Sequence, residues 1–405
     1  MADTGLTYDA QSVPMLPFER ATVVELPPVF HALRAQAPAV RVRTPTGDPA
    51  WLVSRYDDVK ALLDGDLLSR SHPKPERAAR LSKSAILGGP TGDHDTEQED
   101  RRLRRAASSA FSVRRMNLLR PHIQGIVDEL LDQIVAAAPP VDLHEHFSSV
   151  LPIRVICELL GVPVEDRSTF SAIFEAVIDP PGDEPTTEPL LGLFGYVGRL
   201  IRQKQETPGN DFISHVISIR DEHGNPTDDE IVLMVGGLLF AGYHTVTVYL
   251  DYGVVLLLLD PAHRRAVDDD DALVDAVEEV LRFTVPNLGV IPRYARRDMY
   301  IGDVAVAAGD AVLIGLAGAN HDGTVFAAPE RLDLCRRPNP HLAFGHGKHF
   351  CVGAGLARIQ LRISLRSLFQ RLPDLRLAVP VDRLRLRREI LSGGLAEVPV
   401  VWKAP

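Results

Sequence analysis

The stretch that decides the fold reads Phe344-Gly345-His346-Gly347-Lys348-His349-Phe350-Cys351-Val352-Gly353. Three glycines surround its single cysteine, and glycine allows positive φ and close approach of the backbone to a bulky group. Apolar side chains recur at helical spacing after Cys351, so we expect the cysteine to lie at a turn that opens a helix. The free N–H groups and the positive dipole end of that helix would favour a thiolate over a thiol.

Three interpretations of this cysteine compete. A buried structural cysteine does not account for the three glycines and two histidines around it. A zinc site would use His346, His349 and Cys351, although the sequence offers no CxxC or HxxxH partner elsewhere. The third interpretation is a thiolate bound to haem iron.

The same stretch resembles the cysteine loop of the cytochrome P-450 family, whose pattern is Phe-Gly-x-Gly-x-His-x-Cys-x-Gly. All six fixed positions are matched. The resemblance implies a mainly α fold with small β-sheets, in which haem lies between a long central helix and the helix after the cysteine loop. It also implies that Cys351 ligates the iron of haem b. The loop residues expected at the cofactor are Phe344, Gly345, His349 and Gly353.

Composition is that of an ordinary globular protein. The chain has 405 residues and a net charge of −10, so the whole molecule is not expected to bind nucleic acid. Its three cysteines cannot form a disulfide framework and suit a reducing compartment. The first residues lack a basic segment and an apolar run, so we expect no signal peptide and a cytoplasmic protein. Bacterial members of the family likewise lack the membrane anchor of microsomal members.

We expect one domain over residues 1–405, with β-rich parts at about 30–55, 286–318 and 375–402 and helices elsewhere. The longest predicted helix spans about residues 228–260, because Thr227 and Glu230 form a capping box and Asp260-Pro261 ends it. Its apolar run is long enough to suggest a membrane span. Polar residues inside it, including His244 and Thr245, instead favour a helix buried through a large core.

The central helix carries Ala241-Gly242-Tyr243-His244-Thr245, which resembles the family pattern Ala/Gly-Gly-x-Asp/Glu-Thr. The resemblance places Ala241 beside the haem, predicts that the helix opens locally at Gly242, and makes Thr245 a catalytic hydroxyl. His244 replaces the acid that delivers protons from solvent. Either His244 is a substitute proton relay, or it pairs with another group while water carries protons to Thr245.

Haem brings two propionates into the protein, and arginine and histidine can neutralise them through charge-assisted hydrogen bonds. The resemblance assigns this task to Arg104, Arg293 and His349. Arg104 matches the arginine of the family pattern His-x-x-x-Arg. The histidine of that pattern is not matched, because Asp100 stands at its position.

Glu279 and Arg282 are three residues apart on a predicted helix, a spacing that alone carries little information. Their position between the central helix and the cysteine loop resembles a family network whose third member is matched by Arg331. A buried network of this kind is stable only if its charges are satisfied. We therefore expect a structural role for the three residues.

Electrons must come from another protein, because no flavin or nicotinamide fingerprint is present. The resemblance implies that a ferredoxin or flavodoxin with its NAD(P)H reductase supplies the electrons. It also implies that the protein is a monomer that does not bind a membrane. An acidic partner would meet a basic surface. Its predicted members are Arg101, Arg105, Arg114, Arg115, Lys348 and Arg362.

The resemblance implies a monooxygenase that inserts one oxygen atom into a C–H bond, or epoxidises, a mid-sized natural product, free or bound to a carrier protein. Two alternatives remain: a haem-thiolate enzyme performing coupling, peroxide-driven oxidation or nitration, and a haem sensor or electron carrier. Family position and apolar character suggest the substrate-pocket residues Ile86, Phe174, Leu239, Phe240, Tyr243, Val290, Ile291 and Leu391.

Overall fold

The computed structural model describes residues 13–82, 89–90, 97–178, 188–220, 226–387 and 393–403, and only the backbone of 97–101, 175 and 178. Ile86 and Leu391 therefore lie outside the described residues, as do the side chains of Asp100 and Arg101. The chain divides into two compact units. Unit 1 comprises Met1–His94, Val248–Cys351 and Leu372–Pro405, and unit 2 comprises Asp95–Thr247 and Val352–Arg371.

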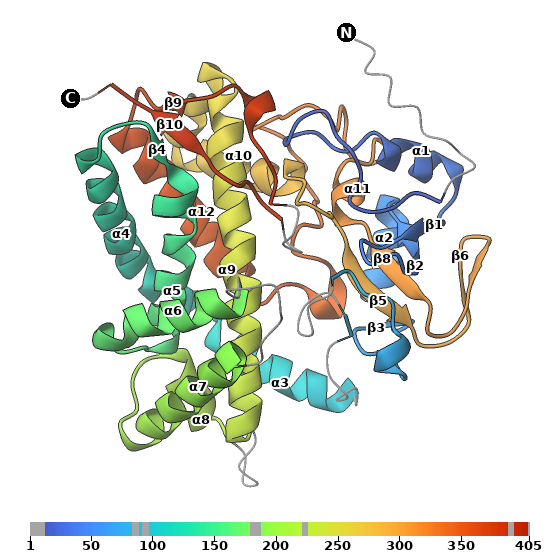
Figure 1. Ribbon diagram of the computed structural model, residues 1–405, viewed down its shortest axis with the longest axis horizontal. Coiled ribbons are helices and arrows are strands. Elements are labelled where there is room, and N and C mark those ends of the chain that lie inside the picture. Colours follow the sequence, from blue (N-terminus) through green and yellow to red (C-terminus); the bar gives the residue numbers. More distant parts are fainter. Residues whose placement is uncertain are drawn as a thin grey trace. The chain divides into compact units, whose positions relative to one another are not determined.

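Unit 1 is built on a five-stranded sheet with strand order β1-β2-β8-β5-β3 (Figure 1). Strand β8 pairs in parallel with β2 and antiparallel with β5, and all four of its residues are buried. A continuous apolar run is what a strand covered on both faces requires. The strands are β1 (Val40–Arg43), β2 (Pro49–Val53), β3 (Leu68–Ser69), β5 (Ile291–Ala295) and β8 (Ala311–Ile314).

Unit 1 also contains shorter strands and several helices. Strands β6 (Met299–Ile301) and β7 (Val304–Val306) form a hairpin, and Gly302 takes φ 58° in its turn. Strands β9 (Arg376–Leu377) and β10 (Pro399–Val401) pair antiparallel. The helices are α1 (Val29–Gln36), α2 (Tyr56–Asp64), α10 (Asp270–Phe283) and α11 (Leu316–Asn320), with the 3-10 turns η1 (Pro75–Arg77), η4 (Pro261–Val267), η5 (Gly347–His349) and η6 (Val381–Arg383).

Unit 2 is mainly helical (Figure 1). Helix α5 shows the sequence logic: its apolar face is buried, and Gly161 ends it in the left-handed conformation at φ 70°. Cys157 on this helix is 1% exposed, as expected for a core residue. The elements are α3 (Glu97–Ala110), α4 (Val113–Ala136), β4 (Val141–Asp142), the π-helical turn η2 (His144–Ser148), α5 (Val150–Leu160), η3 (Val164–Asp166), α6 (Arg167–Ile178), α7 (Glu188–Glu206), α8 (Phe212–Ser218) and α12 (Ala354–Arg371).

Helix α9 (Asp228–Leu258) has 31 residues and continues from unit 2 into unit 1. The predicted capping box is present, since the Thr227 amide donates to Glu230 over 2.7 Å and the Glu230 amide donates to the Thr227 hydroxyl over 3.3 Å. By length and composition α9 is apolar enough to cross a membrane, a test that a core helix also passes. Burial on several faces, including every residue from Val254 to Leu257, favours the core helix.

His321 makes folding stability depend on pH. This side chain of unit 1 is fully buried, and its Nδ1 lies 3.0 Å from the Ala317 carbonyl oxygen. Burial lowers the pKa of His321 to about 4, against about 6.5 in an unfolded chain. The neutral ring is therefore the folded form. Its contribution is complete above the unfolded pKa and is lost as pH falls toward the folded one.

We expect the wild type to lose about 2 kcal/mol of unfolding free energy through His321 between pH 7 and pH 5. His321→Gln cannot take up a proton and should remove that part of the pH dependence in urea unfolding curves. His146→Gln, a change at an exposed histidine, is the control and should leave the curve as in the wild type. Identical pH profiles for wild type and His321→Gln would contradict the prediction.

Candidate active site

The cysteine loop is fixed by backbone geometry. Gly345 and Gly347 have φ 71° and 64°, and the Cys351 amide donates to the Phe344 carbonyl over 2.8 Å, which closes the loop. At Gly347 an added Cβ would lie 2.5 Å from Asp64 Oδ1, so this position requires glycine for space as well as for conformation. The loop therefore packs against the end of α2.

Cys351 lies immediately before helix α12, as predicted from the sequence. Helix α12 begins at Ala354, and the Ala357 amide donates to the Gly353 carbonyl over 2.9 Å. The amides that precede this first helical bond belong to the turn where N–H groups have no intrahelical acceptor. The Cys351 side chain is exposed. An exposed sulfur beside these donors suits a thiolate ligand.

Tyr249 lies close to Cys351, a proximity that the sequence did not reveal. It lies on the part of α9 that belongs to unit 1. Burial, and then the negative charge of Cys351, raise the pKa of the Tyr249 phenol above its ordinary value. The long helix therefore passes beside the cysteine loop within one compact unit.

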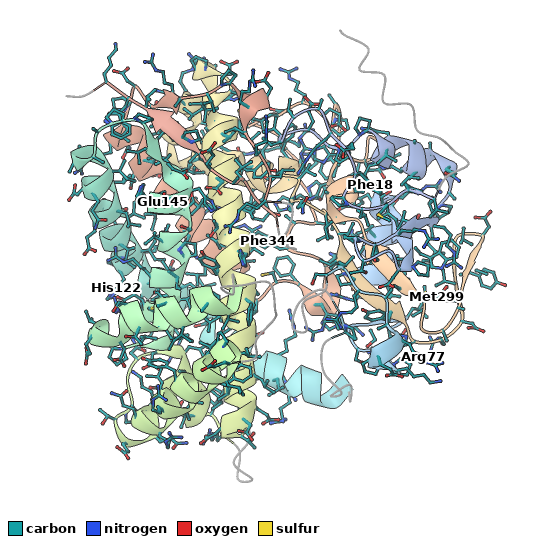
Figure 2. The ribbon with its side chains drawn as sticks, in the orientation of Figure 1. Phe18, Arg77, His122, Glu145, Met299 and Phe344 are labelled. Carbon is teal, nitrogen blue, oxygen red and sulfur yellow. The ribbon has the colours of Figure 1, made fainter. Side chains whose placement is uncertain are left out.

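The donor set fits haem better than zinc. Among the residues that the structure describes, no group of three or more His, Cys, Asp and Glu side chains is arranged to hold a metal ion, so His346, His349 and Cys351 do not form a zinc site. The loop offers one soft sulfur with aromatic rings beside it: Phe344 (Figure 2) lies 6.2 Å from Phe350 between ring centroids. A single thiolate in aromatic surroundings is compatible with an axial ligand of haem iron.

Ala241 and Thr245 lie one turn apart on the exposed face of α9. The Thr245 hydroxyl donates to the Ala241 carbonyl over 2.6 Å. Every residue from 228 to 258 is α-helical, so the local opening expected at Gly242 is absent from this helix. Gly242 instead makes room for α5, because an added Cβ would lie 3.3 Å from Ile156 Cδ1.

His244 is on a different face and is only 9% exposed. Its ring packs edge-on against Tyr243, with 4.9 Å between centroids. Tyr243 in turn contacts Phe174 of α6 at 5.4 Å, and Phe174 contacts Phe240 at 5.7 Å. Three predicted pocket residues therefore form one aromatic cluster with His244. Phe174 is itself fully buried and supports the other rings.

Leu239, another predicted pocket residue, has a fully buried side chain. Two residues of helix rotate a side chain by about 200°. Leu239 therefore faces away from Ala241, into the helical core. Val290 packs at the edge of one apolar cluster of unit 1 and Ile291 at the edge of another, and both are half-buried.

The predicted propionate ligands come from three different elements. Arg104 on α3, Arg293 on β5 and His349 in η5 are all half-buried. Arg293 donates to the Pro292 carbonyl over 2.7 Å, which holds its side chain along the strand. Of the predicted basic surface in unit 2, Arg105 and Arg114 are exposed, whereas Arg115 and Arg362 are half-buried. Lys348, in unit 1, is exposed.

Glu279 is the centre of a buried charge network in unit 1. Arg282 donates to both of its carboxylate oxygens over 2.8 Å. The third arginine is Arg336, whose Nε lies 3.1 Å from Glu279 Oε2, and not Arg331 as predicted. The Arg331 side chain is exposed, and only its carbonyl takes part, as an acceptor from Arg336 over 3.2 Å. The loop that carries Arg331 and Arg336 comes back to α10 only after Arg331. Sequence spacing alone could not show which of these two arginines reaches Glu279.

Comparisons with known proteins agree along almost the whole chain. Residues 194–374 match the family model described as Cytochrome P450. A pentalenolactone synthase from Streptomyces exfoliatus is 40% identical over 400 residues, which cover 96% of this chain and 99% of the relative. A mycinamicin IV hydroxylase/epoxidase from Micromonospora griseorubida is 38% identical over 395 residues, covering 95% of this chain and 98% of the relative.

A solved structure gives the same result for the fold. The substrate-free cytochrome P450 PimD, described as a polyene macrolide antibiotic pimaricin epoxidase, superposes with a TM-score of 0.87. It is 38% identical and covers 97% of this chain and 100% of its own.

Proposed function

The chain belongs to the cytochrome P450 family of haem-thiolate monooxygenases, and from that premise we propose that Cys351 holds the haem iron and that the substrate is a mid-sized natural product. The observation that carries the first part is the exposed Cys351 sulfur at the start of α12. The second part rests on relatives that act on mycinamicin and pimaricin. The apolar cluster around Phe240 and Tyr243 is consistent with such a ligand.

When bound, haem supplies the activation of dioxygen for insertion of one oxygen atom into a C–H bond or a double bond. In this proposal the amides before α12 stabilise the negative charge on the Cys351 sulfur and moderate its donation. Arg104, Arg293 and His349 neutralise the propionates. The Thr245 hydroxyl holds its proton on the exposed face of α9, toward the Ala241 carbonyl.

The direct test is a carbon monoxide difference spectrum of the reduced protein. We expect the long-wavelength Soret band that only haem with a thiolate ligand gives. A natural-product library would then be screened for the spectral change that follows displacement of water from the iron. Absence of the band after haem reconstitution would reject Cys351 as the ligand.

A second candidate function is an oxidation that leaves no oxygen atom in the product, such as coupling. It is favoured by one observation, the histidine at the position where the family pattern has an acid. Turnover under isotopically labelled dioxygen separates the two functions. A labelled product supports monooxygenation, and an unlabelled oxidised product supports coupling.

We expect His244 to deliver protons toward Thr245. It is the only His, Asp, Glu, Lys or Arg between residues 231 and 250, and histidine titrates near neutral pH. His244→Ala should lower product formed per NAD(P)H consumed by about tenfold, a modest value for loss of a proton-transfer group. His244→Glu, which restores the family acid, should recover most of the coupling. Unchanged coupling in His244→Ala would show that water alone carries the protons.

Bacterial enzymes of this kind use a ferredoxin and its reductase and act on small molecules. We propose that an acidic ferredoxin docks on the arginines of α3 and α4. The rate of reduction should then fall about tenfold between low and high salt, as expected for electrostatically steered association. Arg105→Gln with Arg114→Gln should flatten this dependence, whereas Arg265→Gln with Arg383→Gln, at exposed positions elsewhere, should not. A salt-independent rate in the wild type would contradict the docking proposal.

A further inference from the structure

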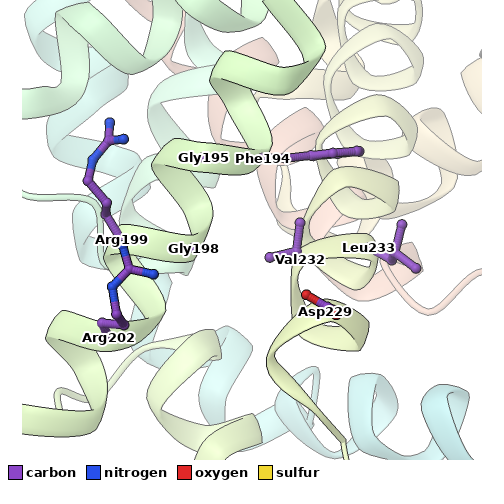
Figure 3. A pocket seen from close by; sticks show the side chains of 8 residues that line it. All are labelled: Phe194, Gly195, Gly198, Arg199, Arg202, Asp229, Val232 and Leu233. Atoms are coloured by element: carbon purple, nitrogen blue, oxygen red, sulfur yellow. The ribbon is translucent and has the colours of Figure 1, made fainter.

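We propose that the cleft between helices α7 and α9 in unit 2 is a second ligand site, which binds an amphiphilic carboxylate. The cleft has a volume of about 610 Å³, within the range of small-molecule sites. Figure 3 shows its two walls, one on each helix. The lining residues are Phe194, Gly195, Gly198, Arg199, Arg202, Asp229, Val232 and Leu233.

Small residues create the space. Phe194 reaches from α7 across to α9 (Figure 3), where its ring carbon would lie 3.4 Å from a Cβ added to Gly236. The absence of a side chain at Gly236 lets the ring lie against the α9 backbone. On α7, Gly195 and Gly198 leave room for two long side chains. The nearest guanidinium nitrogens of Arg199 and Arg202 lie 3.8 Å and 3.9 Å from the Cβ positions of these two glycines.

The floor of the cleft is apolar. Leu233 is 52% exposed, although it lies on a helix whose other leucines are mostly buried. Val232 lies next to Leu233 on α9, and the Phe194 ring extends from α7 toward these two side chains. Leu191, one turn before Gly195, is 67% exposed and extends the apolar surface beyond the cleft. Exposed aliphatic side chains that adjoin a cavity provide area for the hydrocarbon part of a ligand.

The charges of the cleft are unneutralised within the described residues. Arg199 and Arg202 are exposed, and neither forms an ion pair with a described carboxylate. The acids beside Asp229 have partners, since Asp228 pairs with Arg220 and Glu230 pairs with Arg102. Asp229 has none among the described side chains, and it faces the cleft.

The charges of the cleft indicate which polar head group a ligand would carry. Two guanidinium groups on one helix wall favour a carboxylate, which arginine binds through paired charge-assisted hydrogen bonds. Asp229 on the opposite wall disfavours a second negative charge, and therefore a phosphate dianion, while it accepts a hydrogen bond from a hydroxyl or ammonium group. An aliphatic monocarboxylate satisfies the arginines and the apolar floor together.

The test uses dodecanoate as the probe and the haem-loaded enzyme saturated with clotrimazole, which occupies the haem site. We expect calorimetry to show one dodecanoate bound per chain, with no change in the Soret band. Arg199→Gln with Arg202→Gln should weaken this binding at least tenfold, and Gly195→Leu, which fills the cleft and keeps both charges, should also weaken it. Arg265→Gln with Arg383→Gln is the charge-matched control and should bind as the wild type does.

Three outcomes would overturn the proposal. The azole-saturated enzyme could fail to bind dodecanoate, which would place all binding at the haem. The Arg199→Gln/Arg202→Gln and Arg265→Gln/Arg383→Gln variants could bind dodecanoate equally well, which would show that Arg199 and Arg202 do not bind its carboxylate. Dodecyltrimethylammonium could bind as tightly as dodecanoate, which would indicate adsorption to apolar surface without recognition of charge. A failure of the haem assignment would appear as a missing Soret band, whereas a failure of this proposal would appear as dodecanoate binding that does not depend on Arg199 and Arg202.

Discussion

Cys351→Ser is expected to abolish the long-wavelength band of the reduced carbon monoxide complex and to reduce oxidation below detection. Serine keeps the shape of the side chain, but its hydroxyl stays protonated at neutral pH and cannot act as a thiolate. Changes outside the ligand set of a metal cost roughly 10–100-fold in affinity or activity. Loss of the ligand itself should exceed that range. The measurement is the absorption spectrum before and after reduction, with haem content determined on the same sample.

The other two cysteines provide matched controls. Cys335 is exposed, and Cys335→Ser should keep the spectrum. Cys157 is buried on α5, and burial raises the pKa of its thiol to about 12, so it is no source of thiolate at neutral pH. Cys157→Ser should therefore alter stability without altering the band. Retention of the band in Cys351→Ser would show that another residue holds the iron.

The sequence predicted most of the local structure because local signals determine it. Thr227 and Glu230 satisfy the first amides of α9 through their own side chains, so the start of the helix is encoded within four residues. Gly302 determines its hairpin in the same way, through a positive φ. The apolar run Ala311–Ile314 could be interpreted as a buried strand, although its parallel partner β2 is far away in sequence.

Features that depend on rotation about a helix were harder to predict. Leu239, Ala241 and Gly242 lie within one turn of α9, but they face the core, the open side and helix α5 respectively. A motif gives the order of such residues and not the direction in which each side chain points. The same holds for Arg331 and Arg336, which lie in one loop. Only the path of that loop decides which arginine reaches Glu279.

The proximity of Tyr249 to Cys351 could not be predicted for a different reason. The two residues are about a hundred positions apart, and neither has a motif that refers to the other. This proximity follows from the way α9 and the cysteine loop pack in unit 1. Pairings at such sequence separation are properties of the whole fold, and only coordinates reveal them.

Glu279→Gln is expected to produce the largest loss of folding stability of any single change in this network. The substitution keeps the shape of the side chain but removes the negative charge that Glu279 presents to Arg282, which is fully buried, and to Arg336, which is 8% exposed. Leaving buried charge uncompensated costs about 3–5 kcal/mol, a large part of the roughly 5–15 kcal/mol that stabilises an ordinary domain. We expect the urea midpoint to fall with an unchanged m-value and the variant to retain less haem.

Variants of the same network and of a surface pair test whether burial is the cause. Arg336→Ala should cost about 1.5–3 kcal/mol, the usual range for hydrogen bonds to a charged group. Arg331→Ala should cost no more than about 0.5 kcal/mol, because the exposed side chain contributes no contact to Glu279. Asp275→Asn breaks an equally short ion pair, 2.7 Å from the exposed Arg337, and should have no measurable effect. Equal losses in Arg331→Ala and Arg336→Ala would return Arg331 to the network, and a stable Glu279→Gln would show that the buried arginines do not need the charge.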